Sequence, residues 1–234
     1  SLPLDPEGVA RELGFARSYA NSLDAVSDRD FALDLLYACT TTMVHLSRLG
    51  EELVLWTSQE WGWAELANDV ATGSSMMPQK KNPDVGELVR GRAGTAIGRL
   101  TGLLAVAKGL PLTYNRDLQE DKEGVFAQVD ATAGALGVLA VAYASLQFRA
   151  EPMAAAADDG LTVATDVAER LVREGVPFRE AHERVAGAIA RGERFASPTA
   201  AEAIAARAAT PGMPGRWREQ LAAFRAAIAD RASA

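Results

Sequence analysis

The segment from Gly73 to Asp84, which reads GSSMMPQKKNPD, carries the residues of this chain best suited to chemistry. Its serine hydroxyls, lysine ammonium groups and asparagine amide lie close together, and such groups can bind a carboxylate or move a proton. Gly73 allows backbone angles that other residues resist, while Pro78 and Pro83 break any helix through the segment. The sequence therefore predicts a loop, and loops held by a rigid scaffold commonly carry function.

The side chains in this loop favour a site that handles protons and binds carboxylates. A serine such as Ser74 acts as a base only where its anion is stabilised by backbone amides, a helix N-terminus or a nearby ammonium group. Lys80 offers such an ammonium group, and a helix expected to start at Asp84 favours anions at its N-terminus. Asn82 also suits the cap position of that helix, which is its alternative, purely structural interpretation.

Helical periodicity dominates the segments around this loop. One long helix is expected from a cap at Ser27 or Asp28 to about Trp56, a second from about Asp84 to Lys108, and a third that ends before Pro152. The inner faces expected for the first and third helices are Leu36, Cys39, Met43, Leu46, Gly50 and Leu53, and Val125, Val129, Thr132, Leu136, Leu139, Tyr143 and Leu146. Helices of this length predict a long bundle.

The second helix carries a glycine stripe, made of Gly91, Gly94, Gly98 and Gly102, at spacings of three and four. Four glycines inside a helix cost about 3–4 kcal/mol relative to alanine. Close approach of neighbouring helices would offset this cost, so the stripe is expected to pack deep in the bundle. The alternative is a glycine face exposed to solvent.

From about residue 150 the sequence changes to short, alanine-rich helical segments separated by glycine and proline. These helices are expected at roughly 162–174, 178–191, 199–208 and 215–231. We predict an all-α protein in which residues 1–150 form the long-helix bundle, including the loop at 73–84, and residues 151–234 form a small C-terminal helical domain. No β-strand pattern stands out.

Composition excludes several classes of protein. The 234-residue chain has a net charge of −7 and no basic stripe, which argues against a nucleic-acid partner. With Cys39, His45 and His182 as its only cysteine and histidines, neither a disulfide nor a metal site is expected. The apolar window Ala131–Leu146 is shorter than a membrane span, so we interpret it as core and expect no membrane partner. Without a signal-like stretch, a cytoplasmic location is expected.

The loop resembles the signature of the fumarase/aspartase superfamily, GSSxMPxKxNP, and matches every fixed position of it. Its variant QKKNPD, at residues 79–84, is similar to that of the argininosuccinate lyases. Three further segments resemble this family in the same order, namely NSLDAVSDRDF at 21–31, GLPLTYNRDLQEDK at 109–122 and FREAH at 178–182. The resemblance covers the whole chain, and it implies part of the superfamily's central helical domain.

The resemblance implies a lyase that eliminates arginine from argininosuccinate to give fumarate, as in arginine biosynthesis, with no metal or organic cofactor. It implies that Ser74 exchanges the β-proton of the succinyl part, and that Lys80 neutralises the carboxylate as negative charge develops on it. It also implies that Glu87 pairs with a catalytic histidine from another subunit of a homotetramer. The implied substrate contacts are Asn82, Tyr114, Gln119 and Lys122.

Taken alone, several of these residues have simpler interpretations. Glu87 is a first-turn glutamate that favours the helix dipole, and Tyr114 is a loop packing residue. Neither His45 nor His182 lies in a segment that resembles the family's catalytic-histidine motif, so both are expected to be structural or exposed.

The chain starts at Ser1 without an initiator methionine, and the resemblance implies that the catalytic histidine belongs to a half that precedes it. We therefore expect this chain to correspond to the C-terminal half of such an enzyme and to be inactive alone. Two alternatives stay open: another fumarate-releasing lyase, of the adenylosuccinate lyase type, and a non-catalytic helical assembly module.

Overall fold

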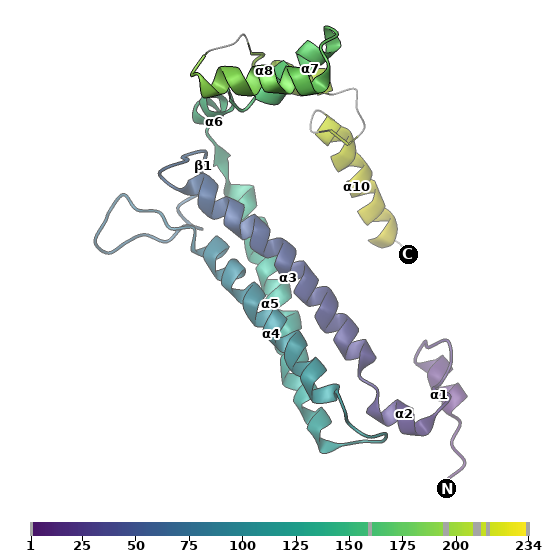
Figure 1. The fold of residues 1–234 in the computed structure, drawn as a ribbon. Helices are drawn as coiled ribbons and strands as arrows, with labels where there is room; N and C mark the ends of the chain where they lie inside the picture. The colour runs from purple at the N-terminus through teal and green to yellow at the C-terminus, as the bar shows by residue number, and fades with distance from the viewer. Residues whose placement is uncertain (1, 159–160, 194–196, 208–211, 214–215, 233–234) are drawn as a thin grey trace. The chain divides into compact units, whose positions relative to one another are not determined.

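A computed structural model describes residues 2–158, 161–193, 197–207, 212–213 and 216–232 of the chain (Figure 1). These residues are almost entirely helical, which confirms the predicted all-α class. The helices are α1 (Pro6–Glu12), α2 (Ser22–Ser27), α3 (Asp30–Thr57), α4 (Asp84–Ala107), the 3-10 helix η1 (Arg116–Glu120), α5 (Asp121–Ser145), α6 (Ala150–Ala157), α7 (Ala164–Arg173), α8 (Phe178–Ala190), α9 (Ala200–Arg207) and α10 (Trp217–Ala232). The chain divides into two compact units, Ser1–Phe148 and Arg149–Ala234.

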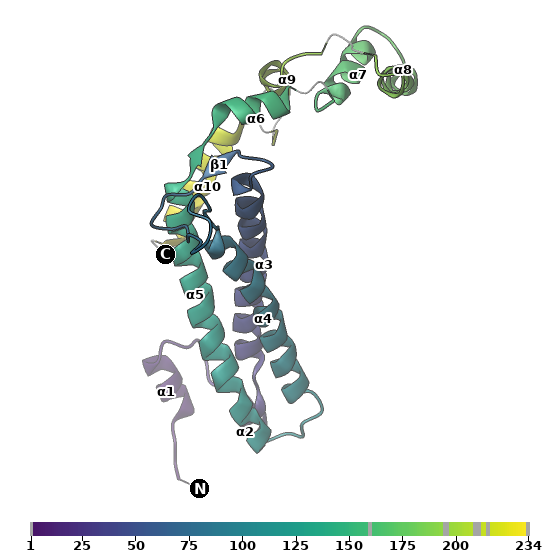
Figure 2. The same ribbon diagram turned by 90° about the vertical axis from the view of Figure 1, so that its left-hand side faces the viewer.

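Three long helices, α3, α4 and α5, form the first unit and alternate in direction (Figures 1 and 2). Each packs against the other two. Their shared core has three layers along the bundle, and apolar side chains buried there supply the main stabilising term. The layers are Ala32, Leu36, Leu103 and Val125 near the start of α3, then Met43, Leu46, Val89, Ala93, Ala96, Ala135 and Leu139, then Leu53, Leu66 and Ala142.

Two short strands tie the end of α3 to the end of α5. Strand β1 (Ala64–Glu65) pairs antiparallel with β2 (Gln147–Phe148). The Trp56 ring makes edge-on contacts with Tyr143 at 6.5 Å and with Phe148 at 5.8 Å. Two-residue strands leave no alternating pattern, so the sequence did not reveal them.

Helix α3 approaches the first turn of α4 closely at Gly50 and Gly86. A methyl group added to Gly50 would lie 2.6 Å from the Gly86 carbonyl oxygen, and one added to Gly86 would lie 2.8 Å from the Gly50 carbonyl oxygen. The two backbones are therefore in direct contact, and this contact fixes the start of α4 against α3.

The glycine stripe of α4 does not make such a contact, so its predicted packing inside the bundle is wrong within this chain. Nothing lies within 4 Å of a methyl group added to Gly91, Gly94, Gly98 or Gly102. Helix α4 packs instead through the face that carries Val89, Ala93, Ala96 and Leu103. The alternative of an exposed glycine face describes the structure.

The predicted inner face of α5 is also partly wrong. Val129 and Leu136 are exposed, while Gln128, Ala135 and Ala142 are buried in their place. Apolar residues surround this helix on all sides, so the spacing of its large side chains does not identify the buried face. In addition, α5 ends at Ser145 and Pro152 lies in the first turn of α6, where proline is tolerated.

The stretch Arg116–Ser145 is long and apolar enough to cross a membrane by length and composition alone. Length alone therefore does not assign this region to the core. Its packing against α3 and α4 supports that assignment instead, because Val125, Leu139 and Ala142 belong to the three core layers.

The second unit is built around helices α7 and α8. Val167, Ala168 and Val185 form its buried cluster, with Leu171 packed against it. Arg207 of α9 forms ion pairs with Asp166 at 2.9 Å and Glu169 at 3.7 Å, both on α7. Arg207 thus joins α9 to this small core.

Candidate active site

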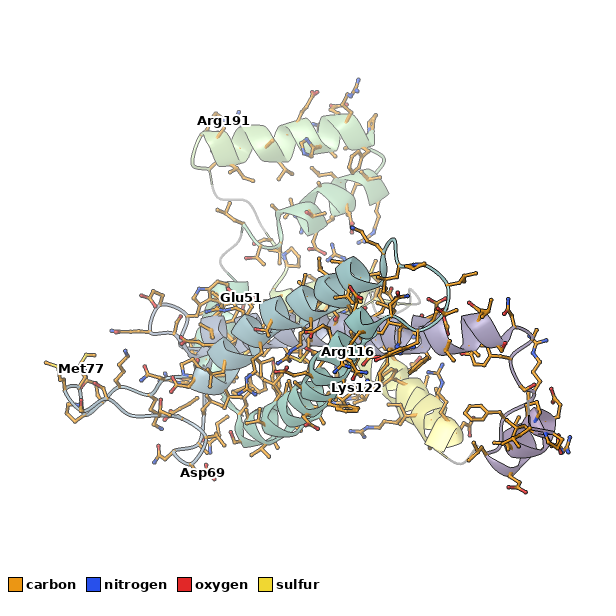
Figure 3. The ribbon with its side chains drawn as sticks, turned by 90° about the horizontal axis from the view of Figure 1, so that it is seen from below. Glu51, Asp69, Met77, Arg116, Lys122 and Arg191 are labelled. Atoms are coloured by element: carbon orange, nitrogen blue, oxygen red, sulfur yellow. The ribbon has the colours of Figure 1, made fainter. Side chains whose placement is uncertain are left out.

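The signature loop is closed at its neck by backbone pairing between Thr72 and Asn82. The Asn82 amide donates to the Thr72 carbonyl oxygen at 2.8 Å, and the Thr72 amide donates to the Asn82 carbonyl oxygen at 3.2 Å. The Thr72 hydroxyl also donates to the Asp84 carboxylate, and Lys81 pairs with Glu65 of β1. Figure 3 shows the loop projecting beyond the helices, with Met77 near its tip.

Asn82 therefore acts through its backbone and does not cap α4. The residue at the cap position is Pro83, and no side chain caps this end of the helix. The structural alternative for Asn82 was wrong because the bridge to Thr72 places Pro83, rather than Asn82, next to the first helical residue.

Ser74 is half-buried, and its hydroxyl oxygen accepts two backbone hydrogen bonds. The donors are the amides of Met76 and Met77, at 3.2 and 3.1 Å. Hydrogen bonds to an oxygen that can lose its proton favour the charged form of that oxygen. The loop backbone thus holds the Ser74 hydroxyl through two amide donors.

Lys80 and Glu87 both point away from the bundle. The Lys80 side chain is exposed, while its amide donates to the Met77 carbonyl oxygen at 3.1 Å and forms a turn. Glu87 lies exposed in the first turn of α4, just after the loop. The hydrogen bond that Arg90 donates to Glu51 raises the pKa of Arg90, and the Glu87 carboxylate adds to this shift. The exposed side chains of Lys80 and Glu87 are therefore accessible to a ligand or to another chain.

The second group of predicted contacts lies in the connection from α4 to α5. The Gln119 amide donates to the Tyr114 hydroxyl, and the Lys122 ammonium group lies 3.1 Å from Asp121. Thr113 has a φ of 78°, an uncommon conformation for a β-branched residue. The Asn115 amide holds this turn by donating to the carbonyl oxygens of Pro111 and Thr113.

The two groups of predicted site residues lie at opposite ends of α4. Ser74, Lys80 and Glu87 are at its start, whereas Tyr114 and Lys122 follow its end. This helix runs from Asp84 to Ala107, so at 1.5 Å per residue its ends are about 35 Å apart. Figure 3 likewise separates Met77 from Arg116 and Lys122. One copy of the chain therefore does not bring the groups into a single site.

Sequence reasoning missed an ion pair beside the second group. Arg29, at the start of α3, lies 2.5 Å from the Asp121 carboxylate, and the exposed fractions of these side chains are 14% and 11%. The two residues are 92 positions apart, so their spacing in the sequence does not indicate that they meet.

Both histidines are exposed, His45 on α3 and His182 on α8, where it lies 6.4 Å from the Phe178 ring. Among the described residues, no group of three or more His, Cys, Asp or Glu side chains is arranged to hold a metal ion.

Comparisons with known proteins agree on one class. Residues 2–98 match the family described as "Lyase", and residues 161–206 match the family described as "Argininosuccinate lyase C-terminal". The argininosuccinate lyase of Frankia casuarinae is 64% identical over 79% of this chain and 40% of its own length. That of Acidothermus cellulolyticus is 51% identical over all of this chain and 54% of its own length. The chain thus spans about half the length of such relatives, or less.

Solved structures give the same answer for the fold. A structure of EDDS lyase in complex with formate has a TM-score of 0.74 and 32% identity, and covers 82% of this chain and 39% of that chain. An EDDS lyase variant with bound fumarate has a TM-score of 0.70 and 29% identity, over 90% and 43% of the two chains. The class II fumarase of Schistosoma mansoni, at 20% identity, shares the fold with a TM-score of 0.66 over 76% and 37%.

The long-helix bundle and the signature loop define a lyase fold of the fumarase/aspartase superfamily. Within that superfamily, the chain belongs to the argininosuccinate lyase family, and it corresponds to part of the full-length enzyme.

Proposed function

We propose that the protein containing this chain eliminates arginine from argininosuccinate and releases fumarate. The signature loop carries this proposal, because its residues match the lyase motif at every fixed position and its fold sets two amide donors on Ser74. The relatives named argininosuccinate lyase favour this substrate within the superfamily. Formate and fumarate bound in the EDDS lyase structures support a site for small carboxylates.

In this mechanism Ser74 takes the β-proton of the succinyl part, and the electrons of that C–H bond form the double bond of fumarate. The arginine nitrogen leaves with the electrons of the C–N bond and takes up a proton. The β-proton next to a carboxylate is only weakly acidic, so the main requirement is a cation that stabilises the developing negative charge. Lys80 meets that requirement, and Asn82 donates a hydrogen bond to a carboxylate. Glu87 orients a catalytic histidine that another subunit contributes.

We further propose that the enzyme is a homotetramer whose sites combine residues from different subunits. The separation of about 35 Å between the ends of α4 supports this arrangement, since Lys122 and Ser74 of one copy cannot meet on one substrate. Exposed apolar side chains on the bundle provide surface for such an assembly, among them Leu88, Ile97 and Phe126.

A substrate test separates this proposal from its alternatives. Argininosuccinate, adenylosuccinate and aspartate are each offered to the chain alone and to the chain with the N-terminal half of the Frankia casuarinae relative, while fumarate absorbance is followed. We expect release from argininosuccinate, and only in the complemented sample. Release from adenylosuccinate alone would overturn the proposal, and no release from any substrate would favour a non-catalytic assembly module.

Replacing the proposed base tests the role of the loop. Ser74→Ala removes the hydroxyl while leaving the backbone turn, so we expect turnover to fall by about 10²–10⁴-fold with helicity and assembly unchanged. Turnover and circular dichroism are measured on the same complemented sample. Ser75→Ala, at the neighbouring hydroxyl, serves as the control and should retain most activity. A Ser74→Ala protein that stays active would move the base to another residue.

A further inference from the structure

The Asp121 carboxylate stands between two cations with very different surroundings. Its Oδ2 atom lies 2.5 Å from Arg29 Nε, and its Oδ1 atom lies 3.1 Å from Lys122 Nζ. Arg29 and Asp121 are nearly buried, whereas the Lys122 side chain is 56% exposed. One carboxylate thus links a fixed internal guanidinium to the exposed ammonium group that the proposed function assigns to substrate.

Arg29 is held in this position by further hydrogen bonds. Besides its contact with Asp121, its Nη1 atom donates to the carbonyl oxygen of Asp28 at 2.6 Å. Arg29 itself occupies the cap position of α3, two residues after the end of the short helix α2. A planar guanidinium with several fixed donors keeps a carboxylate in one orientation better than a flexible ammonium group does.

Asp121 is in turn close to the other predicted contacts along the chain. It is the first residue of α5 and directly follows η1, whose Leu118 is buried at 2% exposure. Gln119, which bonds to Tyr114, lies on that same short helix. The orientation of Asp121 therefore bears on Lys122, Gln119 and Tyr114 together.

From these contacts we propose that Arg29 is a positioning residue, which shares the charge of Asp121 so that this carboxylate holds the Lys122 ammonium group only weakly and leaves it available to a negative group of the substrate. This inference rests on the proposed function for the role of Lys122. Among the described residues, Lys122 is the other cation within ion-pair distance of Asp121. Without Arg29, the nearly buried carboxylate would have Lys122 as its remaining partner and would hold that ammonium group more tightly, because attraction strengthens as water is excluded.

A purely structural alternative makes a different prediction. In that case the ion pair serves only to connect α3 with α5, and the loss of both charges would lower activity at least as much as the loss of one. In the positioning role, removing the Asp121 charge as well should release Lys122. The double variant Arg29→Met/Asp121→Asn therefore distinguishes the two roles.

The test compares Arg29→Met, the double variant and the unaltered chain by two measurements. The first is the rate at which Lys122 is acetylated by acetic anhydride, read by peptide mass spectrometry relative to the exposed Lys108. The second is KM and kcat for argininosuccinate in the complemented enzyme. Arg184→Ala, which removes an arginine from an exposed ion pair with Glu180, is the matched control.

We expect Arg29→Met to slow Lys122 acetylation severalfold and to raise KM by about tenfold, with a smaller change in kcat. The double variant should recover much of both losses, and Arg184→Ala should change neither. Unchanged acetylation in Arg29→Met, or no recovery in the double variant, would overturn the inference. If the unaltered enzyme releases no fumarate, the proposed function fails while the acetylation rates still decide the contact between Asp121 and Lys122.

Discussion

Single residues in this chain acquire their chemical character from neighbours that the fold supplies. The Ser74 hydroxyl oxygen accepts two hydrogen bonds because the loop turns and brings the amides of Met76 and Met77 to it. Lys122 is exposed, yet its ammonium group contacts a nearly buried carboxylate that a distant arginine also holds. In both cases the residue type predicts the chemistry, and the local contacts determine how available the hydroxyl or ammonium group is for it.

Tyr143 provides a residue-level prediction of pH dependence. Its hydroxyl donates to the Leu49 carbonyl oxygen at 2.8 Å, and burial, with a smaller effect of Glu52, raises the pKa of this phenol above its ordinary value of 10.0. The folded state therefore favours the neutral phenol. Its stabilising contribution is complete below pH 10 and is lost as the pH rises through the folded pKa.

We expect Tyr143→Phe to lower the free energy of unfolding by about 1 kcal/mol at neutral pH, because a hydrogen bond is lost. The difference between the two proteins should shrink above pH 10. Urea unfolding at several pH values from 7 to 11 measures it. Tyr19, whose pKa is also raised by its hydrogen bond to Asp28, is common to both proteins and does not affect the difference. A difference that stays constant across this range would contradict the assigned shift.

At the scale of helices, the contact between α3 and α4 separates two kinds of glycine. Gly50→Ala places a methyl group 2.6 Å from the Gly86 carbonyl oxygen, so the helices must move apart. We expect this change to lower the free energy of unfolding by about 1–3 kcal/mol. Gly91→Ala, on the open face of α4, should instead raise it by about 0.5–1 kcal/mol through helix propensity.

Chemical unfolding of both variants measures these two effects against each other. Equal changes in stability, whatever their sign, would show that Gly50 and Gly86 are not in close contact. The comparison is matched because both substitutions add the same methyl group inside a helix of the same bundle.

The long helices were predictable because buried side chains recur with the helical period and because proline and glycine mark the ends. On α3 the expected inner face is the buried face except for the half-buried Cys39, and Leu36, Met43 and Leu53 are almost fully enclosed. On α5 the expected face is only partly the buried one, since Val125 and Leu139 are buried but Ala135 is buried where the larger Leu136 was expected. The signature loop was predictable from residue types, whereas the pairing of Arg29 with Asp121 depends on how distant helices meet.

Many large apolar side chains of the molecule stay exposed after its helices have packed together. On the bundle, exposed side chains include Tyr37 on α3, Leu88 and Ile97 on α4, and Val141 on α5. Large exposed apolar areas usually mark interaction sites. Together with a candidate site divided between the two ends of α4, this surface favours an assembly in which several copies each complete part of a site.

The glycine stripe offers a direct test of that assembly. If α4 of one copy packs closely against a helix of another, bulky side chains on the stripe will separate the copies without disturbing the core of each one. We expect Gly94→Leu/Gly98→Leu to lower the mass measured by analytical ultracentrifugation while helical content is retained, because neither position touches the internal packing. Leucines at Ala154 and Ala155, on exposed positions of α6, add similar bulk outside the bundle and should leave the mass unchanged. A Gly94→Leu/Gly98→Leu protein that assembles like the unaltered chain would exclude the stripe from the interface, and the cost of its glycines would then need another explanation.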